Sequence, residues 1–378
     1  MSERNSTRRR LLVVSPSLTG GGAERFTSHL LTHLSRERWE PHLALFSGHV
    51  TYDVPADVPR FVLQQVGWRT SWRTITQLRQ RILELQPDVV LSTIDYATLF
   101  TGLALRGIEP RPRWVARLGL NTDRRSFSLR DFVSRVALRF LYRGVDQFVA
   151  NSAGLAEQFQ RRFAVSVAKM TTIFNPVDTN QLAAQAADSP LRPRDSSLPL
   201  LVFAGRLHQQ KRPDLLLDAY AELRRTTHAR LWILGDGPLR EALQASIDRQ
   251  GWTEDVQLLG FQTNPFPFIA QADLFILTSD HEGMPNALLE AQALGIPAVA
   301  TRCPFGPEEI ICDHVTGRLV PCGDAIALAT AVRELLADPS ALQQMSHTAR
   351  EHARAKFALP PIMQQWEDVL GDAHSPRR

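Results

Sequence analysis

Cysteine and lysine are both scarce in this chain of 378 residues. The three cysteines, spaced nine and ten residues apart, match no common zinc or redox motif: Cys303, Cys312 and Cys322. We therefore expect reduced thiols with a structural or incidental role, as in a cytoplasmic protein. Only three of the 43 basic residues are lysines, so Lys211 stands out in a chain that otherwise uses arginine.

Long hydrophobic runs are missing as well. No segment approaches the ~20 apolar residues that a membrane-spanning helix needs. A basic start followed by Leu11–Val14 resembles a signal peptide, but the apolar run ends at Ser15 and Pro16, so we expect a first buried strand. With 44% hydrophobic and 22% charged residues the composition is globular, and the length suggests at least two domains.

Short apolar runs alternate with stretches of helical spacing along the chain. This alternation, with almost continuously apolar strands, predicts an α/β fold of parallel sheets covered on both faces. The predicted strands span residues 11–18, 42–47, 89–94, 114–118, 147–151 and 170–174, then 200–204, 230–234, 256–259, 274–278 and 298–301. A stretch at 186–199, rich in proline, serine and charge, predicts a linker between two doubly wound, Rossmann-like domains.

Positive charge is concentrated in the first half of the chain. Residues 1–190 contain 25 Lys and Arg against 16 Asp and Glu, whereas residues 191–378 contain 18 against 23. Arginines interleave with apolar residues in a predicted basic helix at 128–143, and Trp68 and Trp72 also lie beside arginines. This favours docking on an anionic membrane surface, with a solvated charged face as the alternative. We recognise no nucleic-acid-binding module and expect no nucleic acid partner.

Open parallel sheets bind ligands outside the carboxyl ends of their strands, so residues that follow predicted strands are candidates for a site. Gly21 and Gly22 follow the first strand and open a helix whose amides can attract phosphate. Early in the second half, Arg206 and Lys211 could straddle a diphosphate or could be surface charges on a loop. Gly235 could admit a nucleotide close to the backbone or form a simple turn.

The strongest pattern follows the strand at 274–278. Two carboxylates, Glu282 and Glu290, are eight residues apart, the first in a loop and the second in the next predicted helix. The loop and the helix start can hold a phosphate on backbone amides, and Glu282 is placed to accept hydrogen bonds from sugar hydroxyls. The ligand-binding candidates after Glu282 are Gly283, Met284, Pro285, Asn286 and Glu290.

This segment and its surroundings resemble retaining glycosyltransferase family 4. The shared motifs are Gly-Gly-Ala-Glu at 21–24, Asn-Pro-Val-Asp at 175–178, Gly-Arg-Leu at 205–207 and Gly-Pro-Glu-Glu-Ile at 306–310. The resemblance covers nearly the whole chain and implies the two-domain GT-B fold. It implies an acceptor-binding domain at 1–185, a donor-binding domain at 186–358 and a C-terminal helix at 359–378 that crosses back to the first domain.

The resemblance also implies roles for the candidates. Arg206 and Lys211 would bind the diphosphate of a nucleotide-sugar and stabilise the leaving charge, and Glu282 would hold the sugar, so these three are the expected catalytic residues. Glu290 would hold the ribose, and the glycines at 21–22 would close on the diphosphate. The family needs no metal or other cofactor, and no Asp-x-Asp metal motif occurs in this sequence.

At one place the sequence departs from the family. Many members carry a histidine after a middle strand of the first domain, and the comparable strand end here has none. Arg117 or Asn121 could occupy that space on the acceptor side. Asp95 is a candidate acceptor-side base, with a helix N-cap as its alternative role.

The stretch at 303–309 is similar to cell-surface polysaccharide enzymes that use UDP-hexoses or UDP-N-acetylhexosamines. The resemblance therefore implies transfer from such a donor to a glycan or polyprenyl-diphosphate-linked acceptor, by a cytoplasmic enzyme peripheral on the inner membrane. A sugar-nucleotide epimerase of the same architecture is the alternative enzyme. A non-catalytic nucleotide-sugar-binding subunit is the alternative outside enzymes.

Overall fold

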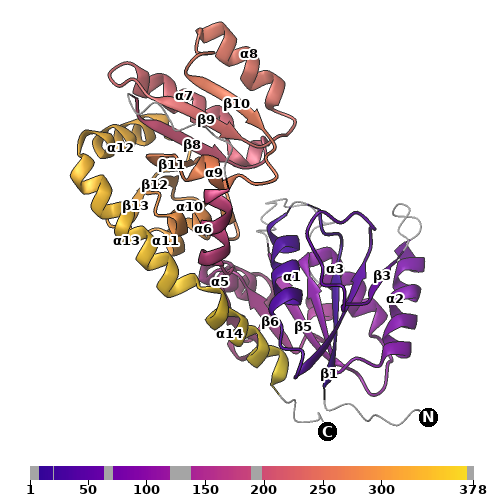
Figure 1. Ribbon diagram of the computed structural model, residues 1–378. Helices are drawn as coiled ribbons and strands as arrows, with labels where there is room; N and C mark the ends of the chain where they lie inside the picture. The colour runs from indigo at the N-terminus through magenta and orange to yellow at the C-terminus, as the bar shows by residue number, and fades with distance from the viewer. Residues whose placement is uncertain (1–7, 20, 64–70, 120–137, 189–197, 373–378) are drawn as a thin grey trace. The chain divides into compact units, whose positions relative to one another are not determined.

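The computed structural model describes residues 8–19, 21–63, 71–119, 138–188 and 198–372. The chain divides into two compact units, unit 1 (Met1–Asn175 with Pro360–Arg378) and unit 2 (Pro176–Leu359). Each unit is a parallel β-sheet with helices packed on it (Figure 1). The expected α/β class with two parallel sheets is confirmed.

Unit 1 contains a seven-stranded sheet with the strand order β3-β2-β1-β4-β5-β6-β7. Its strands are β1 (Arg9–Ser15), β2 (Trp39–Leu45), β3 (Arg60–Val62), β4 (Val89–Thr93), β5 (Arg113–Leu118), β6 (Gln147–Ala150) and β7 (Met170–Thr172). Its helices include α1 (Gly22–His33), α2 (Ser71–Leu85), α3 (Ile94–Ala104), α5 (Ala153–Phe163) and α14 (Leu359–Gly371). The order reverses between β1 and β4, so the carboxyl ends of these strands border the crevice where such sheets bind ligands.

The C-terminal helix α14 packs on unit 1. Trp366 is fully buried and its ring lies 4.7 Å from that of Phe26 on α1. Arg113, at the start of β5, donates hydrogen bonds to the carbonyls of Val369 and Asp372, at 2.9 and 2.7 Å. These contacts bring the end of the chain onto the first sheet and account for its place in unit 1.

Unit 2 contains a six-stranded sheet with the order β10-β9-β8-β11-β12-β13. Its strands are β8 (Leu200–Ala204), β9 (Arg230–Leu234), β10 (Val256–Gly260), β11 (Leu274–Leu277), β12 (Ala298–Thr301) and β13 (Gly317–Val320). Its helices are α6 (Thr179–Ala187), α7 (Pro213–Arg224), α8 (Arg240–Gln250), α9 (Phe266–Ile269), α10 (Asn286–Leu294), α11 (Pro307–Ile310), α12 (Ala325–Ala337) and α13 (Pro339–Phe357). Here the order reverses between β8 and β11, so the loops after these two strands border the crevice of unit 2.

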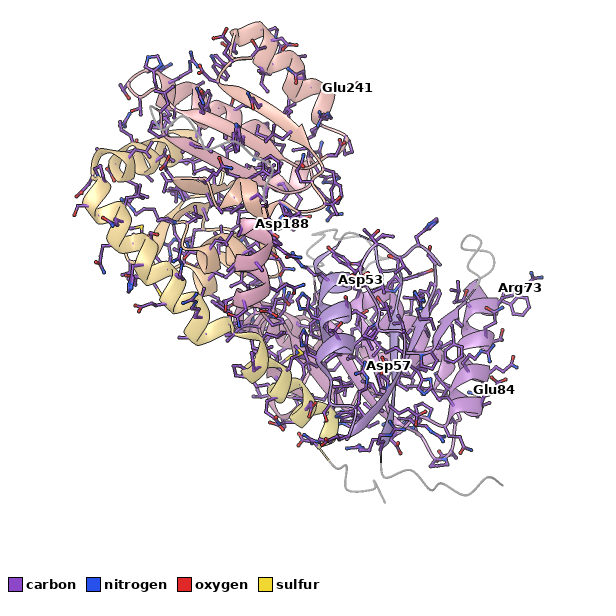
Figure 2. All side chains as sticks on the ribbon, viewed as in Figure 1. Asp53, Asp57, Arg73, Glu84, Asp188 and Glu241 are labelled. Atoms are coloured by element: carbon purple, nitrogen blue, oxygen red, sulfur yellow. The ribbon has the colours of Figure 1, made fainter. Side chains whose placement is uncertain are left out.

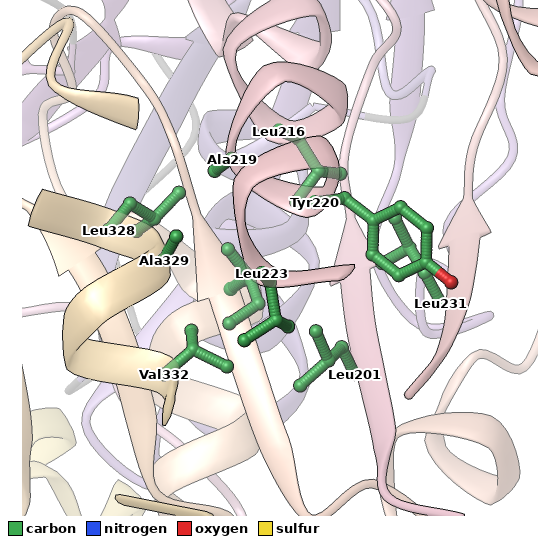
Figure 3. Close-up of a pocket in the computed structure, with 10 residues that line it drawn as sticks. Leu201, Leu216, Ala219, Tyr220, Leu223, Leu231, Leu328, Ala329 and Val332 are labelled. Carbon is green, nitrogen blue, oxygen red and sulfur yellow. The ribbon is translucent and has the colours of Figure 1, made fainter. Parts of the chain in front are cut away.

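The core of unit 2 is well packed. A cavity of about 10 Å³ between α7, α12 and the sheet is lined by apolar side chains such as Leu216, Leu223 and Val332 (Figure 3). This volume is too small for a substrate. Charged side chains such as Arg73, Glu84 and Glu241 are exposed on the outside (Figure 2). The carboxyl ends of the parallel strands are instead the expected place for a ligand site.

The structure differs from the sequence-based prediction in several elements. The strands at 60–62 and 317–320 were not predicted as strands. The division between units falls at Asn175 and Pro176 rather than after residue 185, because α6 packs on α9 and α10 of unit 2. The predicted basic helix at 128–143 lies outside the described residues except for a helical piece at 138–142.

Candidate active site

The loop after β8 lies directly against the loop after β9. Gly205 donates from its amide to the carbonyl of Leu234, at 3.0 Å, and Leu207 donates to that of Asp236, at 2.9 Å. A Cβ on Gly235, whose φ is +123°, would lie 2.0 Å from the Gly205 oxygen. Glycine at 235 is therefore required by this backbone contact, whichever ligand binds nearby.

Lys211 and Glu282 form a largely buried ion pair in unit 2. Lys211 Nζ lies 2.5 Å from Glu282 Oε1, and the two side chains are 16% and 6% exposed. The Ser279 hydroxyl donates to the same carboxylate oxygen at 2.6 Å. The stem of Lys211 also passes Gly205, since a Cβ there would lie 3.7 Å from Lys211 Cδ and Cε. Residues after β8 and β11 thus meet in one cluster.

Main-chain hydrogen bonds hold the cluster in place. The Thr278 hydroxyl donates to the carbonyl of Lys211 at 2.7 Å, and the Asp280 amide donates to that of Gln210 at 2.9 Å. Lys211 does not belong to α7, which begins at Pro213. It ends a short 3-10 turn (Gln209–Lys211), and Arg212 in the left-handed conformation precedes α7. The Lys211 stem accordingly lies against Gly205 of the same loop.

The segment after Glu282 is held by a second close backbone approach. Gly306 has a φ of +86°, and a Cβ on it would lie 2.6 Å from Pro285 Cδ and 3.0 Å from the Gly283 oxygen. Met284 is buried, and Pro285 is the N-cap of α10, which begins at Asn286. The amides at the start of α10 are therefore fixed in position, as a phosphate or sugar site requires.

The other two donor-site candidates also lie in unit 2. Arg206 is exposed and makes no side-chain hydrogen bond or ion pair with the described residues. Glu290 is 8% exposed in the second turn of α10. The structure therefore brings Lys211 and Glu282 into direct contact, leaves Arg206 available to a ligand, and buries Glu290 on the helix that follows the loop.

The cysteines offer no nucleophile for this site. Burial, and next the negative charge of Glu282, raise the pKa of the Cys303 thiol far above neutrality, so it remains protonated. All three thiols are free. Within the described ranges, no group of three or more His, Cys, Asp or Glu side chains is placed to hold a metal ion. No helix there is long and apolar enough to cross a membrane.

In unit 1 the candidate glycines lie where α1 begins. Gly21 is the N-cap of α1, with extended backbone, and no side chain caps the helix through a hydrogen bond among the described residues. Gly22 is the first helical residue and is exposed. The start of α1 follows β1 at the crevice of the first sheet, as the sequence predicted.

Arg117 is buried at the carboxyl end of β5. It is 1% exposed and donates from Nη2 to Asn175 Oδ1 at 2.8 Å. Its guanidinium carbon lies 4.1 Å from the ring centroid of Phe26. Burial lowers the pKa of Arg117 to about 10, an effect partly offset by the negative charge of Glu24. Arg117 therefore remains charged at neutral pH.

The other two acceptor-side candidates have different outcomes. The expected N-cap role of Asp95 is wrong, because α3 begins at Ile94 and its N-cap is Thr93. The side chain of Asp95 is outside the described part of the structure, as is the whole of Asn121. Sequence reasoning missed Ser279 as a partner of Glu282, although it directly follows the predicted strand at 274–278. It also missed Asn175 as a partner of Arg117, although Asn175 belongs to the Asn-Pro-Val-Asp motif.

Comparisons with known proteins agree with this architecture. Residues 20–181 match the family described as Glycosyltransferase Family 4, and residues 198–338 match the family described as Glycosyl transferases group 1. A lipopolysaccharide 1,6-galactosyltransferase of Escherichia coli is 30% identical, over 72% of each chain.

Two further similarities cover almost the whole molecule. An N-acetylgalactosamine-N,N'-diacetylbacillosaminyl-diphospho-undecaprenol 4-alpha-N-acetylgalactosaminyltransferase of Campylobacter jejuni is 27% identical, over 90% of this chain and 93% of the relative. The crystal structure of Alr3699/HepE of Anabaena in complex with UDP superposes with a TM-score of 0.80 at 20% identity, over 96% of this chain and 99% of that one. The chain thus has the fold of the GT-B enzymes, and it belongs to the glycosyltransferases whose two halves are the family 4 and group 1 domains.

Proposed function

We propose that this enzyme transfers a hexose or N-acetylhexosamine from a UDP-sugar to a glycan or polyprenyl-diphosphate-linked acceptor, with retention of anomeric configuration and without a metal. The observation that carries the proposal is the Lys211–Glu282–Ser279 cluster, with Arg206 in the same loop as Lys211 exposed and free of side-chain hydrogen bonds and ion pairs among the described residues. Two relatives support the substrate classes, since one is named for a diphospho-undecaprenol substrate and the Anabaena structure holds UDP.

In this proposal the two cations stabilise the leaving diphosphate. The bond between the anomeric carbon and the diphosphate oxygen breaks, the acceptor hydroxyl bonds to the same carbon on the same face, and its proton passes to the departing diphosphate. Arg206 can bind two diphosphate oxygens with its planar fork, and Lys211 supplies a point charge that Glu282 and the protein fold hold in place. Together they supply the positive charge that a metal would otherwise provide.

Surface features of unit 1 support docking on an anionic membrane. Trp72 on α2 is 60% exposed, and Arg73 lies over its ring at 5.5 Å. Exposed tryptophan beside arginine suits the interface between lipid headgroups and acyl chains. The surplus of basic residues in the first half adds attraction to anionic lipid. Peripheral binding at the inner membrane face would bring the enzyme to a lipid-linked acceptor.

Replacing Arg206 tests the proposed function. We expect Arg206→Ala to lower kcat/KM by about 10²- to 10³-fold, because one preorganised cation at the leaving group is lost. Its melting temperature should not change, since the side chain is exposed and makes no contact that folding needs. Arg249→Ala, which removes an exposed arginine from α8 of the same unit, is the matched control.

The assay supplies a panel of UDP-sugars with and without an acceptor. Transfer by the wild type and the Arg249 variant, and its loss in the Arg206 variant, support the proposal. Wild-type turnover by Arg206→Ala would defeat the assignment. An epimerised nucleotide-sugar formed from donor alone, without transfer, would point instead to an epimerase.

A further inference from the structure

A cavity of about 300 Å³ lies in unit 1, away from the carboxyl ends of the strands. Its walls come from the helical piece at 138–142, the end of α5 and the residues that lead into β6 and β7. Arg143 precedes β6 and Lys169 directly precedes β7, so the cavity borders the amino ends of these strands. Every strand of the sheet runs parallel to its neighbours. The cavity is therefore at the opposite end of the sheet from the crevice between β1 and β4.

The buried residues that line this cavity are aromatic. Tyr142, Phe148 and Phe163 all contribute, and each is less than a tenth exposed. The ring of Tyr142 lies edge-on to those of Phe148 and Phe163, with centroids 5.6 and 5.1 Å apart. Edge-to-face contacts of this kind hold the rings in one arrangement. The inner wall is therefore a preformed apolar surface, as small-molecule sites commonly have.

Three basic side chains line the same cavity. Arg139 and Arg143 are exposed and Lys169 is half-buried. Lys169 Nζ donates to the carbonyls of Val145 and Arg143, at 2.6 and 3.2 Å, and Arg139 Nε donates to the carbonyl of Phe163 at 3.2 Å. These bonds hold the cations at the cavity but do not neutralise their charge. No lining residue in the described part of the chain is acidic.

The carboxylates of this part of unit 1 are engaged with other arginines. Asp146 accepts two hydrogen bonds from Arg111, at 2.7 and 2.9 Å. Glu157 on α5 pairs with Arg161 at 3.1 Å. Arg143 makes no ion pair with a described residue. Like charges gathered at one cavity repel each other, and a bound anion relieves that repulsion.

We propose that this cavity binds a phosphate monoester that carries an apolar group. The phosphate lies among the three cations and the apolar group lies against the aromatic wall. A phosphate monoester carries about 1.5 to 2 negative charges at neutral pH, and a guanidinium binds its oxygens in pairs. The cavity volume is at the lower end for ligand pockets, so it suits one small ester rather than a glycan. The site is separate from the proposed transfer reaction, and either can fail without the other.

Two substitutions test the two features of the site. Arg143→Gln removes one cation whose side chain is exposed, and we expect it to weaken binding by about tenfold. Ser166→Phe fills the cavity from an exposed lining position without changing charge, and we expect a loss of at least about tenfold. Arg161→Gln, which removes an exposed arginine of α5 that does not line the cavity, is the matched control. All three variants should melt at the wild-type temperature.

Calorimetric titration of the full-length protein with 1-naphthyl phosphate tests for a soluble ester. Sedimentation with vesicles that contain phosphatidic acid, compared with vesicles that contain phosphatidylglycerol, tests for a lipid phosphate monoester. Binding in either assay that falls in Arg143→Gln and Ser166→Phe, but not in Arg161→Gln, supports the site and identifies its source. A preference for phosphatidic acid is expected if the source is a lipid, since phosphatidylglycerol is a diester.

Three results would overturn the proposal. They are the absence of binding in both assays, equal binding by all four proteins, and inorganic phosphate binding as tightly as 1-naphthyl phosphate. UDP binding and sugar transfer by Arg143→Gln should remain at wild-type levels. A failure of this site therefore leaves the proposed function standing.

Discussion

Removing the charge of Lys211 should lower both the stability of the fold and the rate of transfer, and a second substitution can restore the first without the second. Lys211→Met keeps the length of the side chain past Gly205 but leaves Glu282 buried without its cation. The carboxylate keeps the hydrogen bond from Ser279, which satisfies only part of its charge. Because the Glu282 side chain is only 6% exposed, water solvates its charge poorly in place of the lost ammonium.

Breaking a buried ion pair in this way costs about 3–5 kcal/mol. For a unit of this size, about 2–4 °C of melting temperature is lost per kcal/mol, so Lys211→Met should melt roughly 10 °C below the wild type. The double variant Lys211→Met/Glu282→Gln removes both charges and should recover most of this stability. Its kcat/KM should nevertheless remain about 10²- to 10³-fold below the wild type, because the cation at the leaving group is still missing.

Thermal melting and transfer assays on the wild type, the two single variants and the double variant complete the cycle. A coupling energy of about 2 kcal/mol or more between the two sites is expected for contacting charges. Additive stability effects would show that the ion pair is not formed in solution. Recovery of transfer by the uncharged double variant would show that Lys211 serves the fold and not the chemistry.

Two further substitutions probe the loop contacts and the membrane surface. Gly235→Ala should destabilise unit 2 by roughly 3 kcal/mol or more and weaken UDP binding, because its methyl group would meet the Gly205 oxygen. The control variant Gly251→Ala, at a φ of +68° with open space around it, should cost only about 1–2 kcal/mol. Equal melting temperatures of the two variants would contradict this reasoning. Trp72→Ala should lower binding to vesicles that contain anionic lipid by about tenfold, while Phe261→Ala, an equally exposed aromatic in unit 2, should not. Equal losses in sedimentation assays would remove Trp72 from the docking surface.

The fold was predictable from the sequence because its strands are buried and apolar. The runs at 200–204, 230–234 and 298–301 match the observed strands residue for residue. The strand at 60–62 is only three residues long with an exposed pattern, so periodicity gave no signal for it. The boundary between the units was misplaced because α6 looks like the end of the first half, and only its packing on α9 and α10 assigns it to unit 2.

The candidate site was predictable as a set of residues but not as a set of contacts. The spacing of Glu282 and Glu290 and the isolated Lys211 were visible in the sequence. The sharing of one Glu282 oxygen by Lys211 and Ser279 depends on two loops that are some seventy residues apart in the chain. Likewise, Arg117 and Asn175 are 58 residues apart, and only the folded sheet brings them together.

Replacing Lys211 in unit 2 and Arg117 in unit 1 with uncharged residues should change the stability of the fold in opposite directions. Lys211 is compensated by a carboxylate, so its loss exposes an uncompensated charge and destabilises the fold. Arg117 has a neutral hydrogen-bond partner, and burial lowers its pKa to about 10. The charged guanidinium therefore lowers the free energy of unfolding by on the order of 3 kcal/mol at any pH below that value. This destabilisation disappears as the pH rises from 10 towards 12.5, the pKa of an unburied arginine.

Arg117→Met should therefore leave unit 1 as stable as the wild type or more stable at neutral pH, which thermal melting would measure. A marked fall in melting temperature would show instead that the guanidinium stabilises the fold by anchoring Asn175.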